Sequence, residues 1–427
     1  MDQYRGILGL LVILAIGVAL STDRRRINVR IVAGGVLLQL ALAALFLRMP
    51  GVADAFDGFA RVVTRVISFA DEGKRFLFGN AVDASKPWGF IFAIQVLPVI
   101  IFFASLMGVL YHLRIMQVVV AALAWVIRRA VGATGVEALS ATANIFLGQT
   151  EAPLTVRPYI PTMTRSQIMA VMTGGFATIA GSVMAAYIGM LGGDSDESRV
   201  LFAKHLITAS VMSAPAGLVM AKVMLPETER PRDESLSSLL RDERTTHDVV
   251  DAAASGATDG LKLALNVAAM LVAFVALLAL LNFPLTALSQ WAPIAQWRAA
   301  HGVPEFTFQN ILGYALSPLA WTLGIDWADA RAFGSLLGTQ VIATEFIAYL
   351  DLARLVRENA MSHRACEIAT YALCGFANIP SIAIQIGGLS AMAPDRRADF
   401  VRIGPRAMVA GALACWMTGC LAGLFIA

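Results

Sequence analysis

Charged residues are scarce in this 427-residue chain: Lys, Arg, Asp and Glu make up only 15% of it, against 58% hydrophobic residues. A soluble domain has about 25% charged residues, and its core could not bury this much apolar surface. The scarcity of charge therefore excludes an ordinary soluble protein and favours a polytopic membrane protein. The net charge of +3 adds little to this conclusion.

Residues that carry chemistry are also few. The four cysteines (Cys366, Cys374, Cys415 and Cys420) all lie in hydrophobic stretches, so we expect small buried side chains. No Cys or His pair has a metal-ligand spacing, and neither G-x-S-x-G nor H-E-x-x-H occurs. We therefore predict a protein that is not an enzyme and has no cofactor. The five histidines lie outside the hairpin segments and the GFA-x-I segments described below, which argues against a histidine proton relay.

A spanning helix needs about 20 apolar residues. Charge-free windows occur at Gly6–Thr22, Ile31–Leu47, Pro87–Tyr111, Ser166–Gly193, Leu206–Ala221, Leu263–Trp297, Phe306–Ile325, Ile368–Pro394 and Ala407–Ala427. The first is interpreted as a membrane helix, not a cleaved signal. The window Leu263–Trp297, which contains Pro284, is too long for one crossing and is expected to continue into an interfacial segment. The pattern from Asp54 to Ile67 predicts an amphipathic interfacial helix.

Basic loops predict the orientation. Asp23–Arg26 with Arg30, and Arg396–Arg406, are expected in the cytoplasm, which places both termini on the outer side of the membrane. The mixed-charge stretch Pro226–Asp248 is interpreted as a cytoplasmic connector.

Two weaker segments, Ala138–Leu154 and Ala332–Leu350, begin with an uncharged limb too short to span. Each contains a glutamate, Glu151 or Glu345, together with glycine or proline. A carboxylate at membrane depth costs roughly 2.5–3.5 kcal/mol, so such residues mark functional sites. We predict two re-entrant hairpins, because irregular backbone is tolerated there only inside protein or beside a cavity.

A repeat follows these segments. Gly175–Ile179 reads GFATI and Gly375–Ile379 reads GFANI, each inside a long apolar stretch with further Gly, Pro or Ser. Broken helices in matching positions of two repeats indicate the binding site of a secondary transporter. An acidic loop, Gly193–Glu197, follows the first copy and the basic loop Arg396–Arg406 follows the second. The two copies are therefore expected to be inverted.

Four motifs resemble those of the concentrative nucleoside transporter family: GQTEAPLTVRPYI (Gly148–Ile160), DAAASGATDGLKLALNVAAMLVAF (Asp251–Phe274), ATEFIAYLDL (Ala343–Leu352) and CGFANIPSIAIQIGGL (Cys374–Leu389). The resemblance implies an all-α polytopic homotrimer with about eight transmembrane helices, two re-entrant hairpins, an inverted repeat and interfacial amphipathic helices. It also implies a scaffold at 1–130, repeat 1 of a transport domain at 131–225, a connector with a scaffold helix at 226–325, and repeat 2 at 326–427. An elevator movement of the transport domain would then import nucleosides, with membrane lipid but no nucleic acid as a partner.

The resemblance also assigns residues to roles. Gln149, Thr150, Glu151, Val183 and Phe376 match positions that contact the nucleobase, and Glu345, Asn378 and Ser381 match positions that bind ribose. A carboxylate and amides can answer the donors and acceptors of such a ligand directly or through water. Asn144, Thr178 and the backbone of Leu147 and Ile179 match the ligands of the coupling Na⁺.

Departures from the family pattern leave alternatives open. Thr178 adds a methyl where many relatives have Ser, so protons remain an alternative to Na⁺. Gln340, Thr344 and Pro380 also depart from the pattern, and the preference for purines or pyrimidines stays open. A nucleobase or another small polar solute is the alternative substrate, and a channel the alternative class. A structural ion pair with Arg157 is the alternative role for Glu151.

Overall fold

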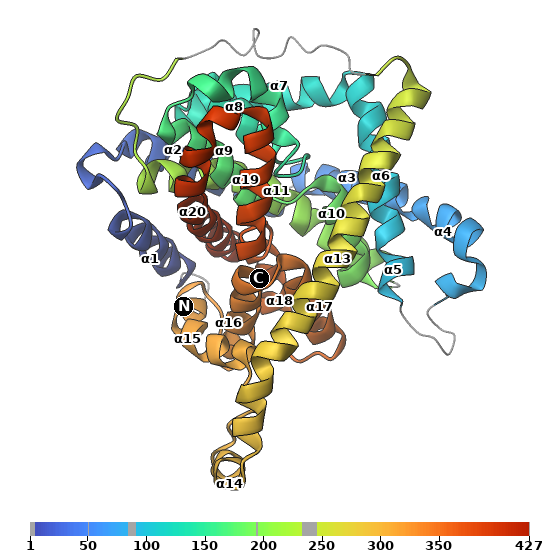
Figure 1. Ribbon diagram of the computed structural model, residues 1–427, viewed down its shortest axis with the longest axis vertical. Helices are drawn as coiled ribbons and strands as arrows, with labels where there is room; N and C mark the ends of the chain where they lie inside the picture. The colour runs from blue at the N-terminus through green and yellow to red at the C-terminus, as the bar shows by residue number, and fades with distance from the viewer. Residues whose placement is uncertain (1–4, 50, 84–90, 194, 233–245, 427) are drawn as a thin grey trace.

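The computed structural model describes residues 5–49, 51–83, 91–193, 195–232 and 246–426. Across these ranges all regular elements are helices and no strand occurs, which confirms the all-helical prediction (Figure 1). The start of the expected window Pro87–Tyr111 and residues 233–245 of the expected connector lie outside the described residues.

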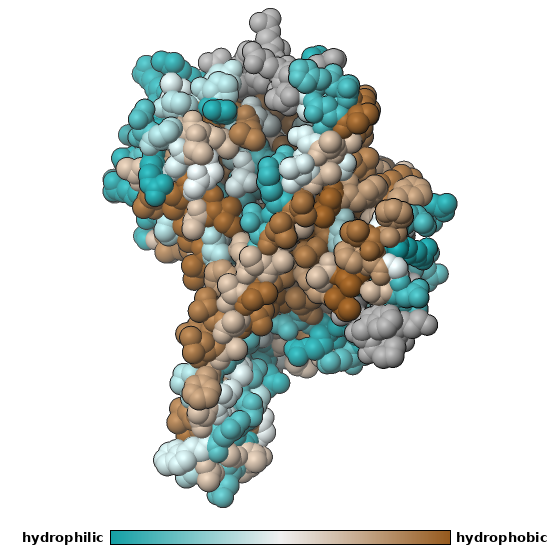
Figure 2. All heavy atoms as spheres, turned by 45° about the vertical axis from the view of Figure 1, so that its right-hand side comes forward, coloured by the Kyte–Doolittle hydropathy of each residue, from teal (hydrophilic) through white to brown (hydrophobic). Residues whose placement is uncertain are grey.

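Six helical stretches in the described ranges are long and apolar enough to cross a membrane: Val29–Leu47, Phe92–His112, Arg165–Gly192, Asp196–Met224, Val249–Gln290 and Pro394–Gly423. Two shorter apolar helices, Arg5–Ala19 and Ile379–Met392, accompany them. Figure 2 shows hydrophobic side chains over the middle of one face, around the long helix α13, and hydrophilic ones towards both ends of the molecule. A wide apolar band between polar ends is the surface that a bilayer requires.

The N-terminal part of the chain contains one of the predicted interfacial helices. Helix α3 covers the expected amphipathic segment, with Ala60, Thr64 and Ile67 turned inward and Phe59 left 52% exposed. The helices here are α1 (Arg5–Ala19), α2 (Val29–Leu47), α3 (Val52–Ser68), α4 (Ala70–Phe78), α5 (Phe92–Gln95), α6 (Leu97–His112) and α7 (Ile115–Val131).

The middle of the chain holds the segments that were predicted to form the first hairpin and the first broken helix. A turn over residues 144–151 separates α8 from a 3₁₀ stretch, η4, and α9 stops before α10 begins. The elements are α8 (Gly135–Ala143), η4 (Ala152–Thr162), α9 (Arg165–Ala177), α10 (Gly181–Gly192) and α11 (Asp196–Met224). Pro158 and Pro161 lie within η4, and their missing N–H donors prevent a regular α-helix there.

Helix α13 is longer than its charge-free window. It runs without a break from Val249 to Gln290, so it includes the motif Asp251–Phe274 and continues through Pro284. The Asp248 side chain accepts a hydrogen bond from the Asp251 N–H and caps the first turn. Pro284 removes one backbone donor without ending the helix. The expected change of direction comes only after it, where α14 (Ala292–His301) is followed by α15 (Phe308–Thr322).

The last part of the chain holds the segments that were predicted to form the second hairpin and the second broken helix. Helix α16 (Trp327–Ile342) ends two residues before α17 (Glu345–Arg357), and Thr344 caps α17 by accepting from Ile347 N–H. Helix α18 (His363–Ala372) and α19 (Ile379–Met392) are separated by the GFANI segment, and α20 (Arg397–Gly423) closes the fold. All four cysteines are buried and free, as predicted.

The two helix breaks touch each other across the core. The Phe376 N–H donates to the Thr178 carbonyl at 3.3 Å, and α20 packs against both α9 and α19. Segments about two hundred residues apart thus meet in the buried middle of the protein, where α9 and α10 are nearly inaccessible.

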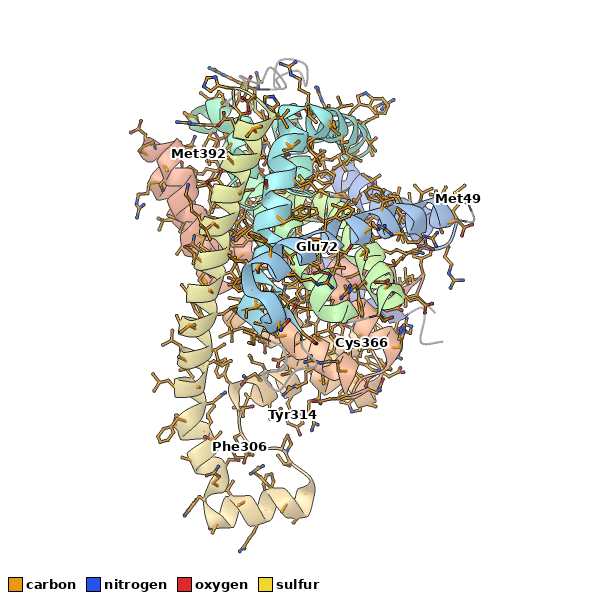
Figure 3. All side chains as sticks on the ribbon, turned by 90° about the vertical axis from the view of Figure 1, so that its right-hand side faces the viewer. Met49, Glu72, Phe306, Tyr314, Cys366 and Met392 are labelled. Carbon is orange, nitrogen blue, oxygen red and sulfur yellow. The ribbon has the colours of Figure 1, made fainter. Side chains whose placement is uncertain are left out.

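Contacts group the two ends of the chain in one region and the basic segments in another. Arg5, at the start of α1, pairs with Asp326 at 2.6 Å, and Arg364 donates to the carbonyl of Gly423 near the end of α20 at 2.7 Å. The basic segments lie elsewhere and together, since Asp23 and Arg402 line one shared cavity. Figure 3 shows Met392 at the top, with Phe306 and Tyr314 towards the bottom.

Candidate functional site

Glu345 is a buried carboxylate held by two hydrogen bonds. Tyr187 Oη donates to Glu345 Oε1 at 3.0 Å, and Asn378 Nδ2 donates to Oε2 at 2.6 Å. Only 5% of the residue is exposed, and no cation lies within ion-pair distance of it in the described ranges. A carboxylate has about four acceptor positions, so two neighbours leave acceptor capacity for a ligand with hydroxyl donors.

Gln149 joins the turn after α8 to α19. Its Nε2 donates to Ser381 Oγ at 3.0 Å, and its Oε1 accepts from Gln385 Nε2 at 3.1 Å. Gln385 also donates to the Met172 carbonyl at 3.1 Å. These contacts cross from the first repeat to the second.

Gly175 allows the side chains of Gln149 and Gln385 to lie close to the backbone of α9. A β-carbon there would lie 2.7 Å from Gln385 Nε2 and 3.0 Å from Gln149 Cβ, closer than van der Waals contact allows. Glycine in the GFATI segment thus leaves room for the two amide side chains beside α9.

Asn378 and Ser381 are positioned by the start of α19. Asn378 Oδ1 accepts from the Ser381 N–H at 2.8 Å, which makes Asn378 the N-cap of the helix. The amide of Asn378 therefore caps the helix with its oxygen and contacts Glu345 with its nitrogen. Pro380 occupies the first turn of α19, where a missing N–H costs nothing.

Aromatic rings surround Glu345. Tyr187 stacks on Tyr349 with centroids 4.2 Å apart and meets Phe346 edge-on at 5.0 Å. Val183 lies one turn before Tyr187 on α10 and is 1% exposed.

The remaining predicted base-side residues lie nearer the surface of this cluster. Thr150 contacts α19, since a β-carbon on Gly388 would lie 3.1 Å from Thr150 Cγ2. Phe376 is half-buried, and Glu151 is exposed. Glu151 Oε2 accepts from the Gly148 N–H at 3.2 Å, and within the described ranges no ion pair joins it to Arg157.

Asn144 and Thr178 flank Gly174. Thr178 Oγ1 donates to the Gly174 carbonyl at 2.9 Å, and a β-carbon on Gly174 would lie 3.2 Å from Asn144 Nδ2. Asn144 is fully buried, and its Oδ1 accepts no hydrogen bond from any residue that the structure describes. The carbonyls of Leu147 and Ile179 likewise accept none from the described residues. The described residues include no cluster of three or more His, Cys, Asp or Glu side chains suited to a metal.

Two departures from the family pattern have structural partners. Gln340 Nε2 donates to the carbonyls of Leu373 and Gly375, each at 3.1 Å, and so ties α16 to the second helix break. Thr344 caps α17, the helix that begins with Glu345.

A buried lysine pairs with a glutamate in the first turn of α8. Lys222 Nζ lies 2.5 Å from Glu137 Oε1 and 3.4 Å from Glu227 Oε2, and it donates to Ser166 Oγ at 2.9 Å. Helices α8, α9 and α11 are therefore fixed to one another through one ammonium group.

Comparison with known families identifies the chain. The model described as "Na+ dependent nucleoside transporter C-terminus" matches residues 205–423, and the corresponding N-terminus model matches residues 8–81. The chain belongs to the Na⁺ dependent nucleoside transporter family. A third model, "Gate: Nucleoside recognition", matches residues 93–194, which include the Gln149 turn and the first helix break.

Relatives of this family match the whole chain. An uncharacterized transporter of Haemophilus influenzae is 44% identical over 100% of this chain and 98% of its own length. The nucleoside permease NupC of Helicobacter pylori is 38% identical over 98% and 97%. Mouse solute carrier family 28 member 3 is 38% identical over 97% of this chain but only 58% of its own length.

Solved structures of a concentrative nucleoside transporter share the fold. CNTnw in an inward-facing substrate-bound state is 42% identical, with a TM-score of 0.89 over 99% of each chain. A CNTnw variant in an outward-facing state gives a TM-score of 0.90 over 100% of this chain and 99% of that one. Membership of this transporter family agrees with the prediction that the chain is not an enzyme.

Two residues at the centre of the site were absent from the sequence predictions. Tyr187 lies one helical turn after Val183, and Gln385 one turn after Ser381. A polar side chain one helical turn after a predicted site residue, in an otherwise apolar helix, could have indicated both residues.

Proposed function

We propose that the protein is a secondary active symporter that imports nucleosides across the bacterial inner membrane, driven by a cation gradient, with Na⁺ favoured. The observation that carries the proposal is the hydrogen bond between Gln149 and Ser381, which joins the two repeats. It places the Gln149 turn beside Asn378 and Glu345, so that both repeats contribute polar groups to one buried site.

The ribose would bind at Glu345, Asn378 and Ser381. Vicinal hydroxyls offer two donors, and the Glu345 carboxylate retains acceptor capacity beyond its bonds to Tyr187 and Asn378. An analogue without those hydroxyls would leave the buried acceptors unpaired, which is a strong basis for selectivity.

The nucleobase would bind towards Gln149, Thr150 and Glu151, with Val183 and Phe376 as apolar walls. Glu151 is an exposed residue at the edge of this cluster, which supports a position that an incoming ligand can reach. Gln149 would exchange its bonds to Ser381 and Gln385 for bonds to the base edge.

The coupling ion would bind between Asn144, Thr178 and the carbonyls of Leu147 and Ile179. The support is the unsatisfied, buried Oδ1 of Asn144, since buried acceptors are normally paired. Oxygen atoms of amides, hydroxyls and carbonyls suit a hard cation. Because Asn144 and Leu147 precede Gln149 in the same turn, a bound ion would order the turn and favour substrate binding.

The architecture that we propose follows the family. Helices α8 and α16 would enter the membrane as limbs of re-entrant hairpins, in an inverted repeat with about eight spanning helices, α3 at the interface and periplasmic termini. Residues 1–130 and the helix of 226–325 would form the scaffold of a homotrimer. Residues 131–225 and 326–427 would form the transport domain that moves as an elevator.

Proton coupling, and a nucleobase or other small polar solute as substrate, remain the second candidates. Uptake of labelled uridine and adenosine into proteoliposomes, with an imposed Na⁺ gradient or an imposed pH gradient, tests both. We expect saturable uptake that requires Na⁺. Uptake that responds only to the pH gradient would refute Na⁺ coupling, and competition by free bases but not nucleosides would refute the substrate.

A further inference from the structure

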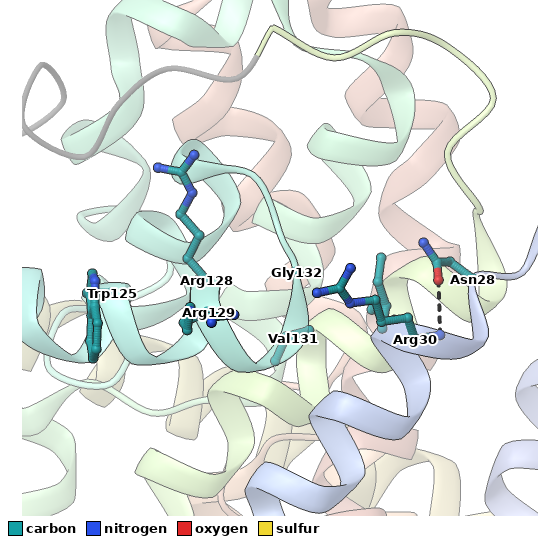
Figure 4. A pocket seen from close by; sticks show the side chains of 8 residues that line it. Asn28, Arg30, Trp125, Arg128, Arg129, Val131 and Gly132 are labelled. Carbon is teal, nitrogen blue, oxygen red and sulfur yellow. Dashed lines mark hydrogen bonds between the residues drawn. The ribbon is translucent and has the colours of Figure 1, made fainter.

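A cavity of about 420 Å³ with an arginine-rich wall lies between the start of α2 and the end of α7 (Figure 4). Arg30 comes from α2, and Trp125, Arg128 and Arg129 come from α7. None of the described residues that line the cavity is acidic. It is separate from the Glu345 site, and nothing in nucleoside binding uses its charge.

Close packing of the two helices brings the arginines together. A β-carbon on Gly34 would lie 2.3 Å from the Ala130 carbonyl oxygen, so the α2 backbone can touch the last turn of α7 only because residue 34 is glycine. Arg30 lies one turn before Gly34 and therefore on the same side of α2. Asn28 Oδ1 accepts from the Arg30 N–H at 3.0 Å, which fixes the turn that Arg30 leaves (Figure 4).

Helix α7 has the character of an interfacial helix. Met116, Val120 and Ala124 are buried on one side, whereas Val118 is 69% and Trp125 63% exposed on the other. The helix is not among the stretches long and apolar enough to span. An amphipathic helix with exposed Val and Trp lies at the level of the lipid headgroups.

The arginines that line the cavity indicate where a lipid headgroup would bind. Trp125, Arg128 and Arg129 are three and four residues apart and so share one face of α7, with Arg30 opposite across the cavity. Neither Arg30 nor Arg129 has an ion-pair partner among the described residues. Guanidinium groups bind phosphate oxygens through paired N–H donors, and basic pockets between helices at the cytoplasmic surface suit anionic headgroups.

We propose that this cavity is a binding site for an anionic phospholipid, with the phosphate between Arg30 and Arg129 and the glycerol and upper acyl chain against Trp125. The lipid would bridge α2 and α7. Helix α7 leads through Gly132, in the left-handed conformation (φ 81°), into α8, so the bridge would hold the chain where the first predicted hairpin begins.

Quenching of Trp125 fluorescence tests the site directly. The full-length protein is reconstituted in phosphatidylcholine vesicles that contain a minor fraction of brominated phosphatidylglycerol, or the same fraction of brominated phosphatidylcholine. Subtracting the signal of Trp125→Phe isolates the quenching of Trp125. We expect phosphatidylglycerol to quench Trp125 more strongly and to saturate.

A matched pair of double variants tests whether Arg30 and Arg129 are responsible for the preference for phosphatidylglycerol. Arg30→Gln with Arg129→Gln should lower the preference for phosphatidylglycerol by about 25-fold, since each basic residue near an anionic surface contributes about fivefold. Arg25→Gln with Arg26→Gln removes the same charge from a neighbouring basic segment outside the cavity, and should retain the preference. If the first double variant fails to fold, Arg30→Gln alone should lower the preference for phosphatidylglycerol about fivefold.

Three results would overturn the proposal. Equal losses in the two double variants would mean diffuse surface charge, and equal quenching by both brominated lipids would mean ordinary contact with the bilayer. Phosphatidylglycerol quenching that does not saturate, together with binding of inorganic phosphate to the protein that Arg30→Gln with Arg129→Gln abolishes, would mean a site for the free ion and not for a lipid.

Discussion

Replacing Glu345 with Gln should abolish most nucleoside uptake without unfolding the protein. The side chain keeps its shape, but one acceptor oxygen becomes an NH₂ donor. Tyr187 can accept from that donor, whereas Asn378 Nδ2 cannot, so the contact that is 2.6 Å long in the wild type favours one amide orientation. A neutral acceptor would then face the ribose hydroxyls.

The magnitude follows from the kind of hydrogen bond that is lost. Bonds to a charged group contribute about 1.5–3 kcal/mol, which corresponds to a loss in uptake efficiency of roughly 10- to 150-fold. Tyr187→Phe is the control: it removes the 3.0 Å donor to Oε1 but leaves the carboxylate, so we expect a smaller loss of roughly fivefold. The assay is the concentration dependence of labelled uridine uptake in proteoliposomes.

The analogue 2′,3′-dideoxyuridine distinguishes ribose recognition from a structural role. It lacks the hydroxyls that Glu345 would bind, so Glu345→Gln should reduce its uptake much less than that of uridine. Equal losses for the two compounds would refute the ribose assignment, and normal uridine uptake by the variant would refute any role in binding.

Changes at four further positions test the surroundings of the site. Gly175→Ala should raise the uridine concentration for half-maximal uptake several-fold, because its β-carbon would displace the amide pair beside α9, and an unchanged value would contradict the packing. Asn144→Ala should raise the Na⁺ concentration for half-maximal uptake, as should Thr178→Val but not Thr178→Ser; equal effects of the two Thr178 variants would argue against a hydroxyl ligand. Lys222→Met should destabilise the fold by about 3–5 kcal/mol in thermal unfolding, because Glu137 would be buried without a cation. Adding Glu137→Gln to Lys222→Met should recover part of the lost stability. No recovery would show that the broken ion pair is not the cause of the destabilisation.

The local sequence was sufficient for the helices and their breaks. Six of the nine charge-free windows lie largely within stretches that are long and apolar enough to cross a membrane, because this property depends on composition within one segment. Glycine and proline predicted the interruptions after Ala177 and before Glu345, since those residues act on their own backbone. Helix α13 extends beyond its charge-free window at the N-terminal end, where Gly256 and Gly260 pack against α6.

The hydrogen-bond partners of the site residues could not be predicted from the sequence. The motifs predicted Glu345 and Asn378 as site residues, but nothing in them predicts that Tyr187 donates to one oxygen and Asn378 to the other. Gln385 was missed because its role depends on Gln149, a residue in the opposite repeat.

The sequence by itself determined the membrane class, the repeated broken helices and the family, because these depend on composition and on motifs read along the chain. Only the tertiary structure decided which polar groups meet. Contacts between Gln149 and Ser381, or between α2 and α7 at Gly34, join residues far apart in the chain. They depend on how closely two helices approach, and that distance is set by every side chain packed between them.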